Sequence, residues 1–180
     1  VYDIKVRSPS CELKGRCYKT LEDGRKVRYK ARLVVKGYQQ KEGVHYNIDE
    51  IYAPTPQTAT IRLLAAHAFK LGWVARGADV RQAFVQTRLP AEQQIPVKLP
   101  KAAGLSSDYL YLLLRSLYGL VQAAHLWHKN IKGRLLEHGF VCIDCDLGVY
   151  ARYGAEDELL CLLALHVDDC YIAGPDNLVE

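Results

Sequence analysis

The chain has 180 residues, 49% of them hydrophobic, which is enough for one substantial core or for two small lobes that share one. It contains no run of about 20 apolar residues, so we expect no segment to span a membrane. The formal net charge of +4 is unevenly distributed: residues 14–41 hold ten basic and two acidic residues, a net charge of +8, which leaves −4 for the rest.

The basic segment contains a predicted β-hairpin. Asp23-Gly24 lies between two runs in which apolar and polar residues alternate, a pattern typical of a tight turn joining two strands. Because side chains alternate between the faces of a strand, the second strand would have one apolar face and one cationic face, formed by Lys26, Arg28, Lys30 and Arg32. A row of cations suits nucleic-acid or nucleotide phosphates, although charge runs are more often solvated surfaces.

The middle of the chain is predicted to hold two helices and two strands, in the order 58–71 (helix), 73–78 (strand), 110–114 (strand) and 121–138 (helix). Thr58 is the expected cap of the first helix, and Gly72 its stop. Asp79 follows the first strand directly. The second helix would end at Gly139.

The C-terminal region is predicted to add strands over 149–153, from Leu159 to Asp168-Asp169, and over 170–173. The run 159–167 is the longest apolar stretch of the chain, which indicates a buried strand. Strands and helices are interleaved, but hairpins join the strands. This order indicates an α+β fold with an antiparallel sheet.

The six cysteines are interpreted as reduced thiols of an intracellular protein, because a domain of this size needs no disulfide staples. Cys142 and Cys145 form a C-x-x-C pair, with His138 just upstream. A zinc site would need a second pair at similar spacing, and Cys11 and Cys17 are too far apart for that pattern. Free thiols in or near the core are therefore preferred over a metal or redox role.

Three aspartates are candidates for chemistry. Asp168 and Asp169 interrupt an apolar run, and two adjacent carboxylates are costly to bury as anions. An exposed turn explains them best on this feature alone, while a divalent cation is the functional alternative. Asp79 could likewise be a helix cap. A metal site requires Asp79 to lie close to the aspartate pair, which is the case if their strands are neighbours in one sheet. Two Mg²⁺ ions held there could activate a primer hydroxyl and stabilise departing pyrophosphate.

Five motifs follow one another along the chain: YKARLVVKGYQQ at 29–40, APTPQTATIRLLAAHA at 53–68, DVRQAF at 79–84, SLYGLVQAAHLW at 116–127 and HVDDCYIAG at 166–174. In this order they resemble the reverse transcriptase domain of copia-type (Pseudoviridae) LTR retrotransposons, from about Cys17 to Gly174. Each motif alone is weak, but five in order are specific. The resemblance implies an RNA-directed DNA polymerase with an α+β fingers-and-palm fold, in which an antiparallel palm sheet packs on helices.

The resemblance also implies roles for individual residues. Asp79, Asp168 and Asp169 would be the catalytic, metal-binding carboxylates, holding two Mg²⁺ ions, with Mn²⁺ as an alternative. Phe84 would lie under the sugar and disfavour a 2′-hydroxyl, although its residue type alone favours a plain core position. Gly119 would permit close approach of the nascent pair. The remaining positions implied in nucleotide or template binding are Lys30, Arg32, Lys36 and Gln122.

The sequence departs from the family pattern at several positions. The family has Lys at Val121, Pro near Ala124, Arg near His125 and Tyr at His166. Losing two cations should weaken phosphate contacts, and the histidine adds a titratable group. The alternative interpretation is therefore a decayed remnant that only binds nucleic acid through its basic hairpin. A nucleotidyl cyclase or another unrelated metal-binding α+β enzyme is a third possibility, which the five ordered motifs disfavour.

The resemblance finally implies a setting. Residues 1–180, which contain no methionine, are interpreted as an internal fragment of a Pol polyprotein, ending after the aspartate pair without thumb or ribonuclease H. The expected partners are an RNA template, a DNA primer, dNTPs, an upstream integrase, and the downstream thumb and ribonuclease H. The family implies a cytoplasmic virus-like particle or the nucleus as the location.

Overall fold

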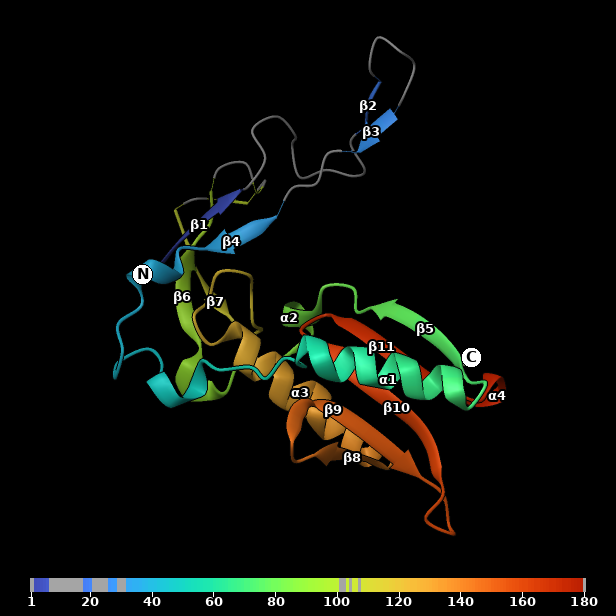
Figure 1. The fold of residues 1–180 in the computed structure, drawn as a ribbon. Helices are drawn as coiled ribbons and strands as arrows, with labels where there is room; N and C mark the ends of the chain where they lie inside the picture. Colours follow the sequence, from blue (N-terminus) through green and yellow to red (C-terminus); the bar gives the residue numbers. More distant parts are fainter. Residues whose placement is uncertain are drawn as a thin grey trace. The chain divides into compact units, whose positions relative to one another are not determined.

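The computed structural model of this chain describes residues 2–6, 18–20, 26–28, 32–100, 103, 105–106 and 108–179 (Figure 1). The chain forms two compact units. Unit 1 comprises Val1–Ile51 and Phe84–Ala123, and unit 2 comprises Tyr52–Ala83 and Ala124–Glu180. Each unit is therefore assembled from segments that are separated in the sequence, and each is described by itself.

Unit 2 is built on a five-stranded sheet with the strand order β5-β11-β10-β9-β8. All of its pairings are antiparallel, which confirms the α+β class with an antiparallel sheet. The strands are β5 (Val74–Asp79), β8 (Phe140–Ile143), β9 (Asp146–Tyr153), β10 (Leu159–His166) and β11 (Asp169–Gly174). The order places β5 at one edge of the sheet, beside β11.

Helices cover both faces of this sheet, which explains the uninterrupted apolar run of β10 (Figure 1). Leu162 and Ala164 lie in a cluster with Leu64 of α1 (Thr58–Lys70). Leu163 and Leu165 belong to a second cluster, against which residues of α3 (Ala123–Glu137) pack. Because neighbouring residues of a strand point to opposite faces, a central strand with both faces covered must be apolar at every position.

The helix ends agree with the sequence in part. Gly72 and Gly139 follow α1 and α3 with φ of 67° and 79°, as predicted for helix stops. The predicted cap at Thr58 is wrong, because Gln57 is the N-cap and makes no side-chain capping bond. Its backbone N–H donates instead to the Asp146 carboxylate at 2.9 Å. A tertiary contact thus replaces the local cap.

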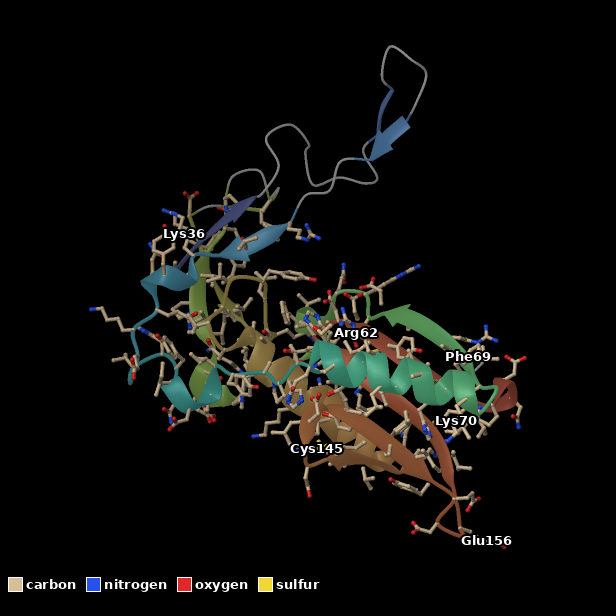
Figure 2. The ribbon with its side chains drawn as sticks, in the orientation of Figure 1. Lys36, Arg62, Phe69, Lys70, Cys145 and Glu156 are labelled. Carbon is tan, nitrogen blue, oxygen red and sulfur yellow. The ribbon has the colours of Figure 1, made fainter. Side chains whose placement is uncertain are left out.

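Other predicted bounds shift by one to three residues. The helix predicted over 121–138 begins at Ala123, and the strand predicted over 149–153 begins at Asp146. The strand predicted over 110–114 ends at Leu113. Figure 2 shows Phe69 and Lys70 at the C-terminal end of α1, where the Phe69 side chain is exposed. Among the described helices, none combines the length and the apolar character that crossing a bilayer requires.

Unit 1 contains a four-stranded sheet with the order β4-β1-β6-β7. Its pairings are antiparallel except for β1 with β6, which is parallel. A second, two-stranded sheet joins β2 to β3 and confirms the predicted hairpin pairing, while its turn at 22–24 lies outside the described residues. The strands are β1 (Tyr2–Val6), β2 (Tyr18–Thr20), β3 (Lys26–Arg28), β4 (Leu33–Val35), β6 (Ile95–Lys98) and β7 (Leu110–Leu113).

The remaining elements are short helices of one turn: η1 (Gly37–Gln39), η2 (Ile48–Glu50), α2 (Ala83–Gln86), η3 (Ala91–Gln93) and α4 (Asp176–Val179). Inward-facing residues of the four-stranded sheet are buried, among them Val35, Ile95 and Val97. The four cysteines in the described part of the chain, including Cys142 and Cys145, are free thiols. Cys11 and Cys17 lie outside the described residues.

Candidate active site

The three predicted catalytic aspartates meet at one edge of the unit 2 sheet. Asp79 is the last residue of β5, and Asp169 is the first residue of β11. The two are direct partners in the antiparallel register, so both side chains belong to the same face of the sheet. Asp168 precedes Asp169 in the turn. A separation of about ninety residues in sequence is thereby reduced to neighbouring positions on two strands.

The aspartate pair lies at a two-residue hairpin turn. His166 of β10 pairs with Asp169 of β11, which leaves Val167 and Asp168 as the turn residues. Val167 has a φ of 57°, in the left-handed region that β-branched residues avoid. Such a conformation costs about 1–3 kcal/mol and persists only where surrounding contacts impose it. The predicted exposed turn is confirmed, because Asp168 is half-buried and Asp169 is exposed.

The end of β5 also contacts the turn directly. The backbone N–H of Val80 donates to the Asp168 carbonyl at 2.8 Å. Asp79 is exposed, and the next helix begins only at Ala83, so Asp79 is not the helix cap that the sequence left open. This backbone hydrogen bond therefore joins the end of β5, which carries Asp79, to the peptide group between Asp168 and Asp169.

The Cys170 thiol lies near all three aspartates. Burial raises the pKa of the Cys170 thiol, and the charges of Asp169, Asp168 and Asp79 raise the pKa further. The charges of all three carboxylates therefore act on the Cys170 thiol. Like charges gathered in this way disfavour one another unless a cation lies among them.

The donor set fits Mg²⁺ chemically, because carboxylate oxygens are the hard ligands that this ion prefers. Among the residues that the structure describes, no group of three or more His, Cys, Asp or Glu side chains is arranged to hold a metal ion. Mg²⁺ in polymerase-type sites is usually held by one or two carboxylates together with substrate phosphates and water.

The predicted nucleotide-binding residues belong to unit 1, and the structure describes all of them except Lys30. Lys30 lies outside the described residues. Lys36 is half-buried and directly precedes η1, where Figure 2 labels it. Arg32 is exposed, and its guanidinium carbon lies 6.0 Å from the ring centroid of Tyr118, within the range of a cation–π contact.

Tyr118 is a residue that the sequence argument missed. The ring of Phe84 lies edge-on to it, with 5.0 Å between the ring centroids and an interplanar angle of 66°. Arg32, Tyr118 and Phe84 therefore form one contiguous cluster of a cation and two aromatic rings. The position of Tyr118 directly before Gly119, within the motif 116–127, is the signal that could have identified it.

Gly119 is required by the backbone around it. Its φ is 92°, and a Cβ at this position would overlap the carbonyl oxygen of Val35. A Cβ on Gly37 would in turn overlap the carbonyl oxygen of Gly119, and the Val35 N–H donates to the Tyr118 carbonyl at 2.8 Å. The backbones at Gly37 and Gly119 are therefore in contact, and neither position has room for a side chain. The predicted approach of a nascent pair to Gly119 stays a prediction.

Gln122 is 1% exposed, and its amide group is engaged at both ends. Its oxygen accepts from Gln40 Nε2 at 2.9 Å, and its nitrogen donates to the His45 carbonyl at 3.4 Å. Gln40 Oε1 also accepts from the Val121 N–H at 2.8 Å. In this state Gln122 links the segment 40–45 to the start of α3, and its predicted contact with template or nucleotide stays a prediction.

Comparisons with known proteins agree with the order of the motifs. The family described as "Reverse transcriptase (RNA-dependent DNA polymerase)" matches residues 14–179. The retrovirus-related Pol polyprotein from transposon TNT 1-94 of Nicotiana tabacum is 34% identical over 164 residues, which cover 89% of this chain and 12% of that polyprotein. The corresponding polyprotein from transposon RE2 of Arabidopsis thaliana is 33% identical over 161 residues, covering 87% and 10%.

No solved structure matches the chain. The chain spans about a tenth of the length of the curated relatives that it matches over most of its own length. The family match covers more than half of the chain, and the relatives are transposon Pol polyproteins. The chain therefore belongs to the reverse transcriptase family, in the copia-type branch of retrotransposon Pol polyproteins.

Proposed function

We propose that this chain is the fingers and palm of an RNA-directed DNA polymerase that adds deoxynucleotides to a primer 3′-end. Unit 2 would be the palm and unit 1 the fingers. The observation that carries the proposal is the register of Asp79 with Asp169, beside Asp168 in the turn. Convergent carboxylates at an exposed sheet edge are open to substrate, as nucleotidyl transfer requires.

Asp79, Asp168 and Asp169 would hold two Mg²⁺ ions, or Mn²⁺, which when bound would activate the primer hydroxyl and stabilise the departing pyrophosphate. The chain's own contribution is to fix these carboxylates, since β5 and the turn are joined by the Val80–Asp168 backbone bond. Neutralising any of the three carboxylates would weaken binding of the cations, which are the charges that would neutralise the substrate phosphates.

The cluster of Arg32, Tyr118 and Phe84 is the proposed nucleotide-binding surface. Arg32 presents a permanent positive charge for a triphosphate, and Lys36 and Lys30 are further candidates. The two aromatic rings offer flat surfaces for a sugar or base. Phe84 would exclude a 2′-hydroxyl because its position against Tyr118 limits its movement. Gly119 and Gln122 would shape the same surface through their contacts with 35–45.

The proposed partners are an RNA template, a DNA primer and dNTPs, with integrase, thumb and ribonuclease H supplied by the rest of a Pol polyprotein. A cytoplasmic virus-like particle or the nucleus is the proposed setting. A second candidate function is nucleic-acid binding without synthesis. It is supported by Val121 and His125 in the motif 116–127, where the family has Lys and Arg.

Primer extension tests the proposal. The chain is fused to the thumb of a related element and supplied with an RNA template, a DNA primer, dNTPs and Mg²⁺. The matched control carries Asp168→Asn and Asp169→Asn. Extension by the parent alone supports the polymerase and the role of the carboxylates. Salt-sensitive template binding by both proteins, with extension by neither, would instead establish the binding remnant.

A further inference from the structure

The turn that carries Asp168 is held from two sides through its backbone. Val80 of unit 2 donates to the Asp168 carbonyl at 2.8 Å. The indole Nε1–H of Trp127 donates to the Val167 carbonyl at 2.6 Å. Both carbonyls of the two-residue turn are therefore occupied, one from the end of β5 and one from α3.

The second of these bonds acts on a peptide in an unfavourable conformation. Val167 has a positive φ and Asp168 does not, the pattern of a type II′ turn, whose first central position favours glycine. For valine, which is β-branched, this conformation is sterically unfavourable. The Val167 carbonyl belongs to the peptide group that leads into Asp168, so rotation of this peptide would re-aim the Asp168 carboxylate.

Trp127 is well suited to prevent that rotation. Its side chain is 2% exposed, and it belongs to α3, a 15-residue helix that packs on the sheet through Ile131 and Leu135. A buried indole N–H needs an acceptor, and here the acceptor is the strained turn rather than a carbonyl of an ordinary strand. The bond thus couples a rigid helix to the turn.

We propose that Trp127 is a positioning residue for the aspartate pair: its indole N–H holds the Val167 peptide, and thereby the Asp168 carboxylate, in the orientation that binds the catalytic cation. The inference deepens the proposed function and rests on it, because a role in orienting Asp168 matters only if Asp168 is a ligand. Supporting groups of this kind typically change metal affinity by about 10- to 100-fold when they are lost.

The first test needs no substitution in the turn. The chain has two tryptophans, so a ¹⁵N-labelled sample gives two indole N–H signals, and Trp73→Phe assigns them. Trp73 precedes β5 and lies about 20 Å along that strand from Asp79. We expect the Trp127 indole proton to exchange slowly with solvent, and added Mn²⁺ to broaden its signal before that of Trp73. Fast exchange of the Trp127 proton would overturn the proposal.

The second test measures binding of Mn²⁺ alone by loss of the free-ion electron paramagnetic resonance signal. Trp127→Phe keeps a ring but removes the donor, and we expect Mn²⁺ affinity to fall about tenfold. Trp73→Phe is the matched control and should leave the affinity unchanged. Adding Val167→Gly to Trp127→Phe should restore part of the affinity, because glycine adopts a positive φ without an anchor.

The outcomes separate this inference from the proposed function. Mn²⁺ affinity in Trp127→Phe within twofold of the parent would overturn the positioning role, even if primer extension by the parent succeeds. A parent that binds Mn²⁺ with the expected Trp127 dependence but extends no primer would overturn the polymerase and leave the anchor standing. If Trp127→Phe fails to fold, the exchange measurement on the parent decides.

Discussion

At the scale of single residues, the contact between Gly119 and Val35 leaves no room for a side chain at position 119. Gly119→Ala would add a methyl group against the Val35 carbonyl oxygen and force a side chain into a φ of 92°. We expect a loss of about 2–5 kcal/mol in the free energy of unfolding, measured by urea titration.

Gly43→Ala is the control for this substitution. Gly43 also has a positive φ, of 73°, but a Cβ there meets no atom within 4 Å. It should therefore cost about 1 kcal/mol, from backbone conformation alone. Equal losses in the free energy of unfolding for Gly119→Ala and Gly43→Ala would show that the contact of Gly119 with β4 does not cause the larger expected loss.

Asp146 gives a pH-dependent prediction. Burial alone would raise its pKa, but hydrogen bonds from Thr60, Gln57 and Gly148 hold the pKa below its ordinary value of 3.8. A depressed pKa in the folded state means that the bonds stabilise the fold above that ordinary value. The stabilisation is then lost as the pH falls from 3.8 through the folded-state pKa.

Asp146→Asn is the variant that tests this. At pH 7 we expect it to lower the free energy of unfolding by about 1.5–3 kcal/mol, because two backbone N–H groups lose a charged acceptor. This loss in the free energy of unfolding should shrink as the pH falls below 3.8. Urea unfolding at a series of pH values measures it. A deficit that does not change with pH would contradict the assignment of the effect to the carboxylate charge.

At the scale of elements, the buried amides of Gln40 and Gln122 connect two segments that lie far apart in the sequence. Their bond joins the residues after η1 to the start of α3, across 82 positions. Buried amides require partners, so removing one leaves the other unsatisfied. The pair therefore specifies how these segments meet, more than it adds net stability.

A double-mutant cycle measures this coupling. Gln40→Leu and Gln122→Leu should each lower the free energy of unfolding by about 1–3 kcal/mol, because each leaves buried polar groups without partners. The double variant should lose less than the sum, with a coupling of about 0.5–3 kcal/mol, since the two costs share one bond. Strict additivity in urea unfolding would mean that the two amides act independently.

At the scale of the whole molecule, the proposed metal-binding residues Asp79, Asp168 and Asp169 bring three negative charges to neighbouring positions. If these carboxylates bind a cation as proposed, the bound cation would favour the folded state over the unfolded chain. Active sites commonly concentrate such unfavourable charge. The stability of the molecule should therefore depend on divalent ions through these three residues.

Thermal unfolding with and without Mn²⁺ tests this dependence. At about ten times the dissociation constant, Mn²⁺ should stabilise the parent by about 1.4 kcal/mol, a rise in Tm of about 3–6 °C. EDTA should abolish the rise. The variant carrying Asp168→Asn and Asp169→Asn should show no rise and a higher Tm than the cation-free parent. An equal Mn²⁺ effect in both proteins would refute binding at this edge.

Local patterns made the two long helices and several strands predictable, whereas β1, β6, β8 and the one-turn helices were not predicted. The alternation around Asp23-Gly24 predicted the β2–β3 pairing, and the helix-stop glycines, Gly72 and Gly139, predicted where α1 and α3 end. These signals work because turn and helix-end conformations depend on a few consecutive residues. The N-terminus of α1 was mispredicted at Thr58 because its acceptor, Asp146, comes from a distant strand.

By itself, the sequence determined the reverse transcriptase family, the antiparallel α+β class and the three aspartates as the candidates for chemistry. Those conclusions depend on residue types, their spacing and their order along the chain. Only the tertiary structure decided that Asp79 lies opposite Asp169, that Tyr118 joins Arg32 and Phe84, and that Trp127 holds the turn. The physical reason is that a side chain specifies which kind of partner it needs, whereas strand register and packing select which residue that partner is.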